Sequence, residues 1–421
     1  MPRLPIPGSD EEQWGALLND FLRAGHRADG ATSQVAEVYN VRDFGARGDD
    51  ATDDTRAIQA AIDAAQAACG GVVSFPVGVF RTTATLLLKS NAVVLQGAGN
   101  ASIIKPAMPT GAAIRISHAN DLFQCINNQV ADLTLDRGVR PEPTAIGLTI
   151  EHARYTRVAR LNVHNQGIGI AVGVPEMGGI PTQFVYIDQV FVSGGNFPDA
   201  GIRFFSGADY AVSRSFIEPS NRGIVMSGDA NGIFIMQTSV INGNAYEFGI
   251  VSEGTGFARY LIGVNVENAL QAQIHIGGNP GTKRIVISSC WLGAGDLKGA
   301  TRTGIRIEPG IENVVISECR IGDQRMYGIH SQGSRVRIAG NIIEANSTLG
   351  ARRFDGIYLA GGSDVIVQSN LVHGPNHRYG IYTAGNLDNY IISENILRGN
   401  GSGGLLDTAT GTHKLVGTNL Q

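Results

Sequence analysis

Charge and long apolar runs are both scarce in this sequence. Charged residues make up 17% of its 421 residues, where average proteins have about 25%, and the formal net charge is −4. A general nucleic-acid-binding protein needs a basic face, so this class is not expected. No apolar stretch approaches the roughly 18 residues of a transmembrane helix, so membrane insertion is not expected either.

Cysteine is also rare. The four cysteines are Cys69, Cys125, Cys290 and Cys319. They are far apart without Cys-x-x-Cys spacing, so we expect neither a zinc site nor a disulfide framework, but reduced thiols in the core. The opening segment MPRLPIPG lacks the apolar region of a secretory signal peptide. No metal or cofactor is expected.

Glycine, in contrast, is in excess. The 56 glycines are about 13% of the chain, against roughly 7% in average proteins. They have no three-residue period and proline is only 15, which excludes a collagen-like chain. From residue 147 onward a Gly-Ile-like pair recurs about every 26 residues. Its copies begin at Gly147, Gly169, Gly201, Gly223, Gly249, Gln273, Gly304, Gly328, Gly356, Gly380 and Gly404.

A second pattern inside each repeat places a small or polar residue three positions after an aliphatic one. This position is held by Ser215, Thr238, Asn265, Cys290, Cys319, Asn341, Asn370 and Asn395. Each repeat therefore contains at least two short strands separated by turns, without helical periodicity. The repeats lack the leucine-rich signature and are shorter than a propeller blade. They predict an all-β, right-handed parallel β-helix of about 11 or more coils, with the small and polar residues stacked as interior ladders.

The first 34 residues differ from the repeats. Ser9 and Glu12 form a capping-box pattern. Apolar residues follow at helical spacing, namely Trp14, Leu17, Leu18, Phe21 and Leu22. We therefore divide the chain into residues 1–34, an amphipathic helix with a linker for attachment or oligomerisation, and residues 35–421, the β-helix domain. An ordinary helix lying on the β-helix is the alternative for the first part.

A second helix is predicted at about residues 54–68. Ile58, Ile62 and Ala65 lie on one face, Thr52 or Asp53 precedes it, and two glycines end it. Strands are expected at residues 71–76 and 86–96. The helix is expected to cap the open end of the β-helix, which would otherwise expose a sheet edge and the core.

The segment from Tyr39 to Ile62, YNVRDFGARGDDATDDTRAIQAAI, resembles the opening of the pectate-lyase-like β-helix superfamily. The likeness extends to Gly97 and implies the same fold. It leaves the activity open, because that superfamily includes hydrolases, lyases, epimerases, fructotransferases and phage tailspikes. Three family signatures are missing, those of polygalacturonases, of calcium-dependent pectate lyases and of alginate epimerases, and these activities are disfavoured.

Residues 4–22, LPIPGSDEEQWGALLNDFL, resemble the Trp-Gly-x-x-Leu-Asn segments of phage tail-fibre and tailspike proteins. This resemblance implies attachment to a phage or injection-machine baseplate, a homotrimer, and a virion-associated or extracellular location.

Strand alternation locates an outward face beside the Gly-Ile pairs, because every second side chain points away from the core. The first outward column is Thr149, Ala171, Arg203, Val225, Val251, His275, Arg306, His330, Tyr358 and Tyr382. The next is Glu151, Gly173, Phe205, Ser227, Glu253, Gly277, Glu308, Gln332, Ala360 and Ala384. Apolar Phe205, Val225 and Val251 are interpreted as a subunit contact. Asp136, in the turn that follows Leu133, is interpreted as structural.

The polar part of this face suits a polysaccharide. Glu253 and Glu308 lie two coils apart, about 9–10 Å, near the upper limit for an inverting glycosidase, and are the acid and base candidates. Glu247 is an alternative partner, and His275 or His330 could serve as a lyase base. The expected substrate-binding residues are Arg203, Glu247, Arg306, His330, Asp355, Tyr358, Arg378 and Tyr382.

The sequence thus predicts a tailspike-like homotrimer that binds and cleaves a bacterial surface polysaccharide without a metal. Two alternatives remain open. One is a free-standing carbohydrate-active enzyme, either fructotransferase-like or a polysaccharide lyase. The other is a tail or baseplate fibre that adheres without catalysis.

Overall fold

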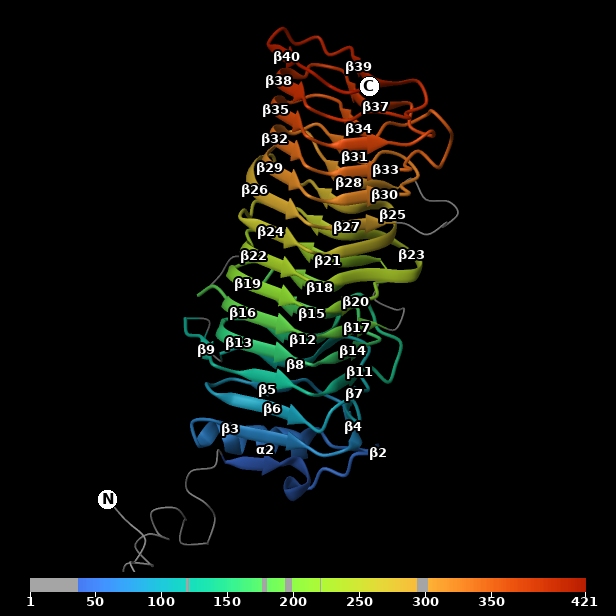
Figure 1. Cartoon of the computed structure of the whole chain (residues 1–421). Helices are drawn as coiled ribbons and strands as arrows, with labels where there is room; N and C mark the ends of the chain where they lie inside the picture. The colour runs from blue at the N-terminus through green and yellow to red at the C-terminus, as the bar shows by residue number, and fades with distance from the viewer. Residues whose placement is uncertain are drawn as a thin grey trace, which may run out of the picture.

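The structure is a computed structural model that describes residues 37–118, 120, 122–175, 180–193, 199–219, 221–293 and 302–421. The helix expected within residues 1–34 lies outside these residues. The described chain winds into a parallel β-helix of about 13 turns, which confirms the predicted fold class. Figure 1 shows the earliest coils at one end of the rod and the last coils at the other. No helix in the described ranges is long and apolar enough to span a membrane.

A typical turn contributes three strands in three parallel rows. The first row is a 16-stranded sheet. Its strands are β1 (Val38–Asn40), β3 (Gly71–Phe75), β6 (Val93–Gly97), β9 (Cys125–Ile126), β10 (Gln129–Ala131), β13 (Ala153–Ala159), β16 (Gln183–Asp188), β19 (Ala208–Ser213), β22 (Asn231–Met236), β24 (Arg259–Ile262), β26 (Gly281–Ser288), β29 (Ile311–Ser317), β32 (Ser334–Ala339), β35 (Ser363–Gln368), β38 (Asp388–Ser393) and β40 (Lys414–Val416).

The second and third rows belong to one 24-stranded sheet. The second row comprises β2 (Asp49–Asp53), β4 (Gly78–Thr82), β7 (Ser102–Pro106), β11 (Thr134–Asp136), β14 (Asn162–His164), β17 (Phe191–Ser193), β20 (Phe216–Ile217), β27 (Trp291–Gly293), β30 (Arg320–Gly322), β33 (Ile342–Glu344) and β36 (Leu371–His373). The third row comprises β5 (Leu86–Leu88), β8 (Gly111–Ile116), β12 (Ala145–Ile150), β15 (Ile168–Val172), β18 (Ala200–Phe204), β21 (Arg222–Met226), β28 (Thr303–Ile307), β31 (Ile329–Ser331), β34 (Ile357–Leu359), β37 (Tyr379–Thr383) and β39 (Gly403–Asp407).

Two long strands, β23 (Ser239–Ser252) and β25 (Asn265–Ile276), run from the second row into the third and join them. The sequence predicted at least two strands per repeat, and the short second-row strand is the third. The single strand expected at residues 86–96 is wrong. It is two strands, β5 and β6, separated by a turn in which Ala92 adopts a positive φ of 57°.

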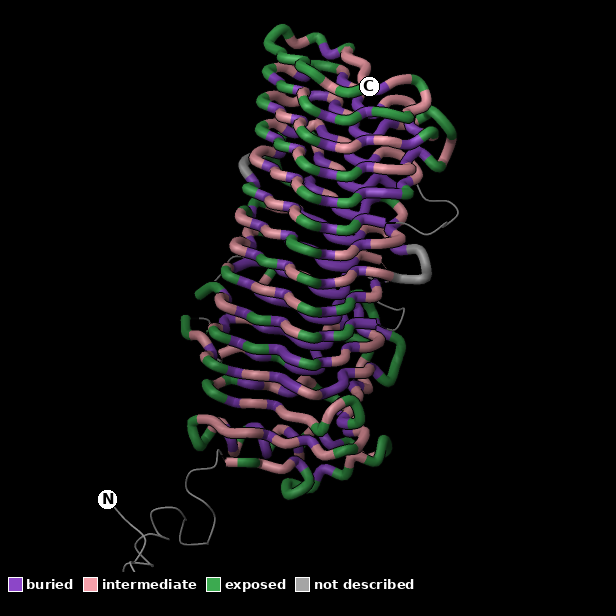
Figure 2. The backbone as a smooth tube through the Cα atoms, in the orientation of Figure 1, coloured by how far each residue is buried: buried purple, intermediate pink, exposed green. Residues whose placement is uncertain are grey.

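One apolar core runs the whole length of the rod. Alternate residues of all three rows point inward, and most of these side chains are fully buried. Figure 2 shows this as buried backbone segments recurring at the same place in successive coils. Because the inward positions stack from coil to coil, each side chain packs mainly on its counterparts in the adjacent coils.

A sharp turn joins the first row to the second in most coils. Its central residue is left-handed even where it is not glycine, as in Glu318, Ser369 and Glu394 with φ of 55–59°. Such a conformation costs energy for a residue with a Cβ atom. The residue after it points into the core, so hydrogen bonds from this inward side chain can offset the cost.

The asparagine ladder supplies those bonds, as predicted. The Nδ2 group of Asn341 donates to Oδ1 of Asn370 at 2.9 Å, and the same bond links Asn370 to Asn395 and Asn395 to Asn419. Each Oδ1 also accepts the backbone N–H of the preceding asparagine at 3.0 Å. Each of these side chains thus ties its own turn to the next.

Cys290 and Cys319 occupy the same position earlier in the chain. Both are 2% exposed, and their thiols donate to backbone carbonyl groups. The prediction for Asn265 was wrong: the inward residue of that coil is Val264, because the left-handed residue there is Gly263. Asn265 begins β25 and bonds to Glu267 instead.

The glycine near the start of most third-row strands is required by the closeness of the coils. A Cβ atom at Gly169 would lie 2.4 Å from the carbonyl oxygen of Gly201, and one at Gly223 would lie 2.4 Å from that of Gly249. Real Cβ atoms do not approach so closely. The recurring glycine therefore marks the point where the backbone of one coil lies directly on the next.

The N-terminal end is closed by helix α2 (Thr55–Ala67), after a short 3-10 helix, η1 (Val41–Phe44). The inward face of α2 is Ile58, Ala61, Ile62 and Ala65, all fully buried in the main core. The predicted capping helix is confirmed. Its N-cap is Asp54, one residue later than expected, and the Asp54 carboxylate accepts the backbone N–H groups of Arg47 and Gly48.

A second interior ladder, which the sequence did not suggest, lies where the second row turns into the third. Asn346 accepts the backbone N–H of Gln324, and Nε2 of His377 accepts the N–H of Asn346, both at 3.0 Å. Nδ1 of His377 lies 2.9 Å from Oδ1 of Asn400, so it carries the proton and donates it. Burial lowers the pKa of His377 to about 4, because the charged ring would be desolvated.

We expect Asn370→Ala to lower the free energy of unfolding by about 3 kcal/mol, because it leaves several buried donors and acceptors unpaired. Asn419→Ala is the matched control, since this asparagine ends the ladder and is partly exposed. Its cost should be nearer 1 kcal/mol. Urea unfolding monitored by circular dichroism measures both. Equal effects would mean that the ladder does not couple the coils.

Stability should also fall in acid. The folded pKa of His377 lies below its ordinary 6.5, so the stabilisation is present above pH 6.5 and is lost as pH falls toward about 4. His377→Gln keeps an acceptor and a donor without titrating, and should remove about 3 kcal/mol of the difference between pH 7 and pH 4. The half-exposed His373, changed to Gln, is the control. An unchanged pH profile in the His377 variant would refute this assignment.

Candidate functional site

The predicted outward column exists in register. Backbone pairing places these residues at one position of consecutive third-row strands: Arg203, Val225, Val251, His275, Arg306, His330, Tyr358 and Tyr382. We call the outward side of this row the third-row face. Its polar residues fall into three groups along the rod.

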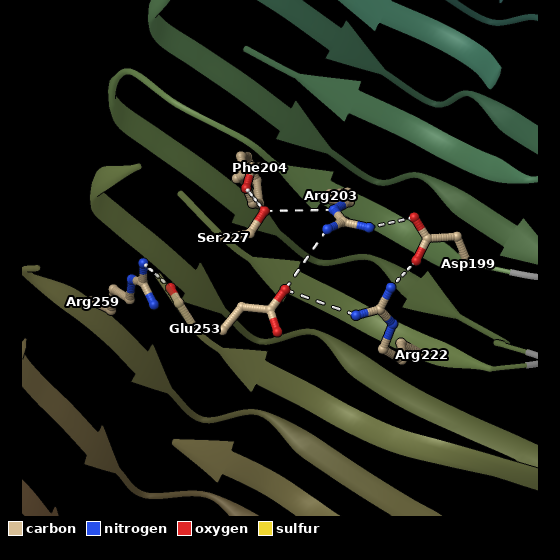
Figure 3. A network of polar contacts seen from close by, with 7 residues as sticks. All are labelled: Asp199, Arg203, Phe204, Arg222, Ser227, Glu253 and Arg259. Carbon is tan, nitrogen blue, oxygen red and sulfur yellow. Dashed lines mark hydrogen bonds and ion pairs between the residues drawn. The ribbon is translucent and has the colours of Figure 1, made fainter. Parts of the chain in front are cut away.

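The first group is a ring of four charges that we call the charged cluster (Figure 3). The Asp199 carboxylate contacts the guanidinium groups of both Arg203 and Arg222 closely. Glu253 faces the same two arginines from the other side, with Oε1 at 3.7 Å from Arg203 and 3.8 Å from Arg222. Asp199 therefore holds the arginines tightly, while Glu253 lies beyond hydrogen-bond distance and is held loosely.

Asp199 and Arg222 were missed by the sequence analysis, although a signal was present. Asp199 lies two residues before one strand-opening glycine, and Arg222 lies directly before the next. Asp355 and Arg378 occupy the same kind of position nearer the C-terminal end of the rod, before β34 and β37, and form the same kind of pair. An acid before one coil and an arginine before the next thus recur together.

Glu253 is supported from inside the rod. Arg259 is fully buried and donates to the backbone carbonyl of Glu253 at 3.0 Å and to the Ser252 hydroxyl. Burial lowers the pKa of Arg259 to about 10 and that of Lys283 to about 8. Lys283 donates to the carbonyl of Gly254, so two interior cations hold the turn that carries Glu253.

The second group comprises His275, Arg306 and Glu308. Glu308 Oε1 lies 2.7 Å from Arg306 Nε and 3.7 Å from His275 Nε2. Gly277 makes this approach possible, because a Cβ atom there would lie 2.5 Å from the histidine ring. Burial lowers the pKa of His275, while the charge of Glu308 partly opposes the shift. The imidazole is thus neutral at pH 7 and can accept a proton.

The third group is a row of stacked rings that we call the aromatic track. Tyr327 stacks on Tyr358 at 5.1 Å, His330 stacks on Tyr358 at 5.1 Å, and Tyr358 stacks on Tyr382 at 5.2 Å. Burial, followed by the charge of nearby Arg306, lowers the pKa of His330, and burial raises that of Tyr327 to about 12. Tyr327 was missed because it precedes the strand-opening glycine.

Arg378 lies over the Tyr382 ring at 4.5 Å and is held by Asp355 through two bonds of 3.0 and 2.8 Å. Asp355 also accepts the backbone N–H of Tyr379. The Asp355 side chain is 0% exposed, so it cannot touch a ligand on the surface as predicted. It positions Arg378 instead. Burial raises the pKa of Asp355, and the arginine opposes that shift.

Glu247, the alternative acid, begins the same third-row passage as Glu253 and accepts a 2.8 Å bond from Gln271. Its negative charge opposes, to a small extent, the lowering of the His275 pKa by burial. Asp136 accepts a bond from Asn165 in the next coil at 2.7 Å, in keeping with a structural role. Across the described ranges, no three histidine, cysteine or acidic side chains gather to hold a metal ion.

The predicted subunit contact was wrong in two of its three residues. Val225 and Val251 are 0% and 4% exposed, packed with Ala200 and Phe248 in a small cluster of their own. They point outward in register, but their packing with Ala200 and Phe248 already covers them. Phe205 is partly exposed and lies under the guanidinium of Arg203 at 4.8 Å.

Solved structures similar to this one include phage proteins. The N-terminal fragment of gene product 12 of bacteriophage phi29 matches with a TM-score of 0.64 at 16% identity, covering 89% of this chain and 72% of that one. The Dettilon tailspike protein matches with a TM-score of 0.62 at 19% identity, covering 93% and 73%. At these identities the likeness shows the fold.

Among curated proteins, alginate lyase 7 of Azotobacter vinelandii is 47% identical over 74 residues, which are 16% of this chain and 9% of that protein. The chain therefore spans only a small part of this relative. A model of the right-handed β-helix region matches residues 260–420 and agrees with the predicted handedness. A second model, described as rhamnogalacturonase A/epimerase, pectate lyase-like, matches residues 38–251, half of the chain. With its opening coils, capping helix and strand register all inside that match, the protein belongs to the pectate-lyase-like rhamnogalacturonase A/epimerase family.

Proposed function

We propose that this protein is a tailspike-like protein that binds and cleaves a bacterial surface polysaccharide on its third-row face. One observation carries the proposal. Consecutive coils present carboxylates, arginines and a neutral histidine, and the same line continues into the aromatic track. Folding alone does not require such a series on an outward face. The similar phage structures support the tailspike part of the proposal.

The aromatic track is the binding half of this site. Because the rings stack face to face, they present their edges and hydroxyl groups along the rod, and these can contact the edges and hydroxyl groups of sugar rings. Arg378, held by Asp355, adds a fixed cation beside them for an acidic sugar. Because successive rings lie one coil apart, a linear polymer lying along the rod can contact several of them at once.

The charged cluster and the His275 group form the reacting half. Glu253 and Glu308 are the acid and base candidates, two coils apart in register. Each faces an arginine, which attracts its carboxylate toward the path of the polymer, and only Glu308 has a contact as short as 2.7 Å. Glu253 is the one with freedom to turn toward a substrate, since its arginine contacts are long. The proposed cleavage uses no metal or cofactor.

A lyase is the second candidate. It is favoured by His275, a neutral imidazole with Nε2 3.7 Å from Glu308. A lyase base removes a proton beside a sugar carboxyl group, and Arg306 could hold that carboxyl group.

We expect Glu253→Gln and Glu308→Gln each to lower kcat by about 100-fold or more on a polysaccharide that the wild type cleaves. Glu344→Gln is the matched control, because this arginine-paired glutamate lies on the second row, away from the site. Mass spectrometry of the products separates the chemistries. Saturated ends indicate a hydrolase, unsaturated ends a lyase, and an anhydride a fructotransferase-like enzyme.

If a variant that carries both Glu253→Gln and Glu308→Gln keeps the wild-type rate, the two glutamates are not the acid and base. If the wild type binds polysaccharides from a broad screen but cleaves none, the protein is an adhesin. A free-standing enzyme differs from both in having no partner particle. Loss of incorporation into phage tails on deletion of residues 1–34, with binding retained, would separate the tailspike from that alternative.

We also propose that the protein is a homotrimer whose contact is on the second row rather than at the valines. Aromatic and aliphatic side chains there stay 36–43% exposed along the rod, namely Phe191, Phe216, Trp291, Ile342 and Ile396. A monomeric protein seldom leaves such a line of apolar groups uncovered. These residues share one register position, which Ser239, Asn265 and Arg320 interrupt. Another rod of the same repeat is a partner that can cover the apolar parts of this stripe.

Light scattering should give a trimer mass for the full chain and for residues 35–421. We expect Trp291→Glu with Ile342→Glu to yield monomers, because charges would enter an apolar contact. Phe205→Glu, at the position that the sequence suggested, should leave the trimer intact. A monomeric wild-type protein at micromolar concentration would contradict the proposal.

A further inference from the structure

The outward face of the 16-stranded sheet has two shallow depressions that the proposed site does not use. One, of about 270 Å³, lies over β10, β13 and β16 and is lined by Asn127, Asn128, Gln129, Tyr155, Arg157 and Tyr186. The other, of about 480 Å³, lies over β24, β26, β29 and β32. Tyr260, Arg284, Asn313 and Arg335 border it above a floor of Val286 and Val315. Figure 1 shows these strands stacked along one side of the rod.

Each depression has an aromatic side chain in its wall that is stacked on a neighbouring ring. Tyr155 stacks on Phe184 at 5.0 Å, and the guanidinium of Arg154 lies over both rings at 4.9 and 5.2 Å. Tyr155 and Tyr186 are 44% and 42% exposed. A side chain held in place by stacking loses little freedom when a ligand binds, which favours affinity.

The second depression is built in a similar way. Phe234 and Tyr260 are partners in adjacent strands, and their rings are nearly parallel at 4.5 Å. Arg284 and Arg335 line the same depression from β26 and β32, and Arg335 is also paired to Glu312. A flat ring beside guanidinium and amide groups is a combination that suits a sugar ring carrying an acidic group.

The residues that line the two depressions also argue against glycosidic cleavage there. Neither described set contains an aspartate, glutamate, histidine, cysteine, serine or threonine. In these two linings only the tyrosine hydroxyl groups can transfer a proton, and no carboxylate or histidine of the linings accompanies them as a second catalytic group. Each lining does carry at least one arginine, so its own charge is positive and complements an anionic ligand.

We propose that this sheet face is a second, non-catalytic binding surface for an acidic polysaccharide, with one subsite at each depression. The proposal rests on the proposed function only in taking the ligand to be a polysaccharide. Tyr186 and Tyr260 stand at the same register position three strands apart, in β16 and β24. That separation is about 14 Å along the rod, so one polymer chain can occupy both subsites. Two weak contacts on one chain then act as a stronger one.

Affinity electrophoresis of the full chain through gels that contain alginate, polygalacturonate or dextran tests this surface. We expect the two acidic polymers to retard the wild type. Tyr186→Ala with Tyr260→Ala should raise the apparent Kd about 10-fold or more, because each subsite loses a ring. Arg157→Gln with Arg284→Gln should act in the same direction and should weaken retardation by dextran much less. The kcat of any depolymerisation should stay at the wild-type value in both double variants.

Tyr358→Ala, in the aromatic track, is the matched control, and circular dichroism checks that each variant is folded. Retardation that survives Tyr358→Ala but is lost with the two tyrosines supports the second surface, even if the protein cleaves nothing. The proposal is overturned if no polymer retards the wild type, if dextran retards it equally, or if Tyr358→Ala alone abolishes retardation. It is also overturned if the tyrosine variants change the mass in light scattering without changing the Kd, since the face would then join copies of the chain.

Discussion

Stacking of the coils in strict register is the constraint on which the other features depend. The constraint is imposed from inside, where Asn370 and its neighbours bind both their own turn and the next one. Left-handed residues such as Ser369 make the turn tight enough for these bonds. The close carbonyl contacts at Gly169 and Gly223 impose the same spacing from another corner. Residues 22–32 positions apart in sequence are thereby brought to one line on the surface.

That register explains how the proposed site is assembled from a chain with so few charges. The charged cluster, His275 with its partners, and the aromatic track each draw residues from two or more coils, and none of these groups is local in sequence. Rigid coils hold the groups at fixed offsets without a dedicated scaffold loop. The interior cations Arg259 and Lys283 then fix the one turn that carries Glu253. The site is therefore a property of the stacked coils rather than of any single motif.

Much of this arrangement could be predicted because a parallel β-helix converts sequence period directly into position. The glycine pairs, the asparagine ladder and the outward column all follow from counting residues. The predictions that failed concerned the register of one turn and the lateral packing of side chains. Val264 rather than Asn265 points inward, because the inward residue directly follows the left-handed one, here Gly263, as it does in the other turns. Counting three positions from Ile262 instead of Leu261 placed the ladder one residue too late. The burial of Val225 depends on the lengths of its neighbours, which period alone does not give.

The equal spacing of the rings in the aromatic track limits what can lie along it. The coils repeat at about 4.8 Å, and this interval cannot stretch while the interior ladders hold. The rings on this face therefore repeat at one fixed interval. A linear polymer whose repeat differs from this interval stays in register with the rings for only a few sugar units. Beyond those units its sugars lie between the rings. The number of sugar units that the face can bind then depends on how well the polymer repeat matches the coil repeat, rather than on the length of the rod.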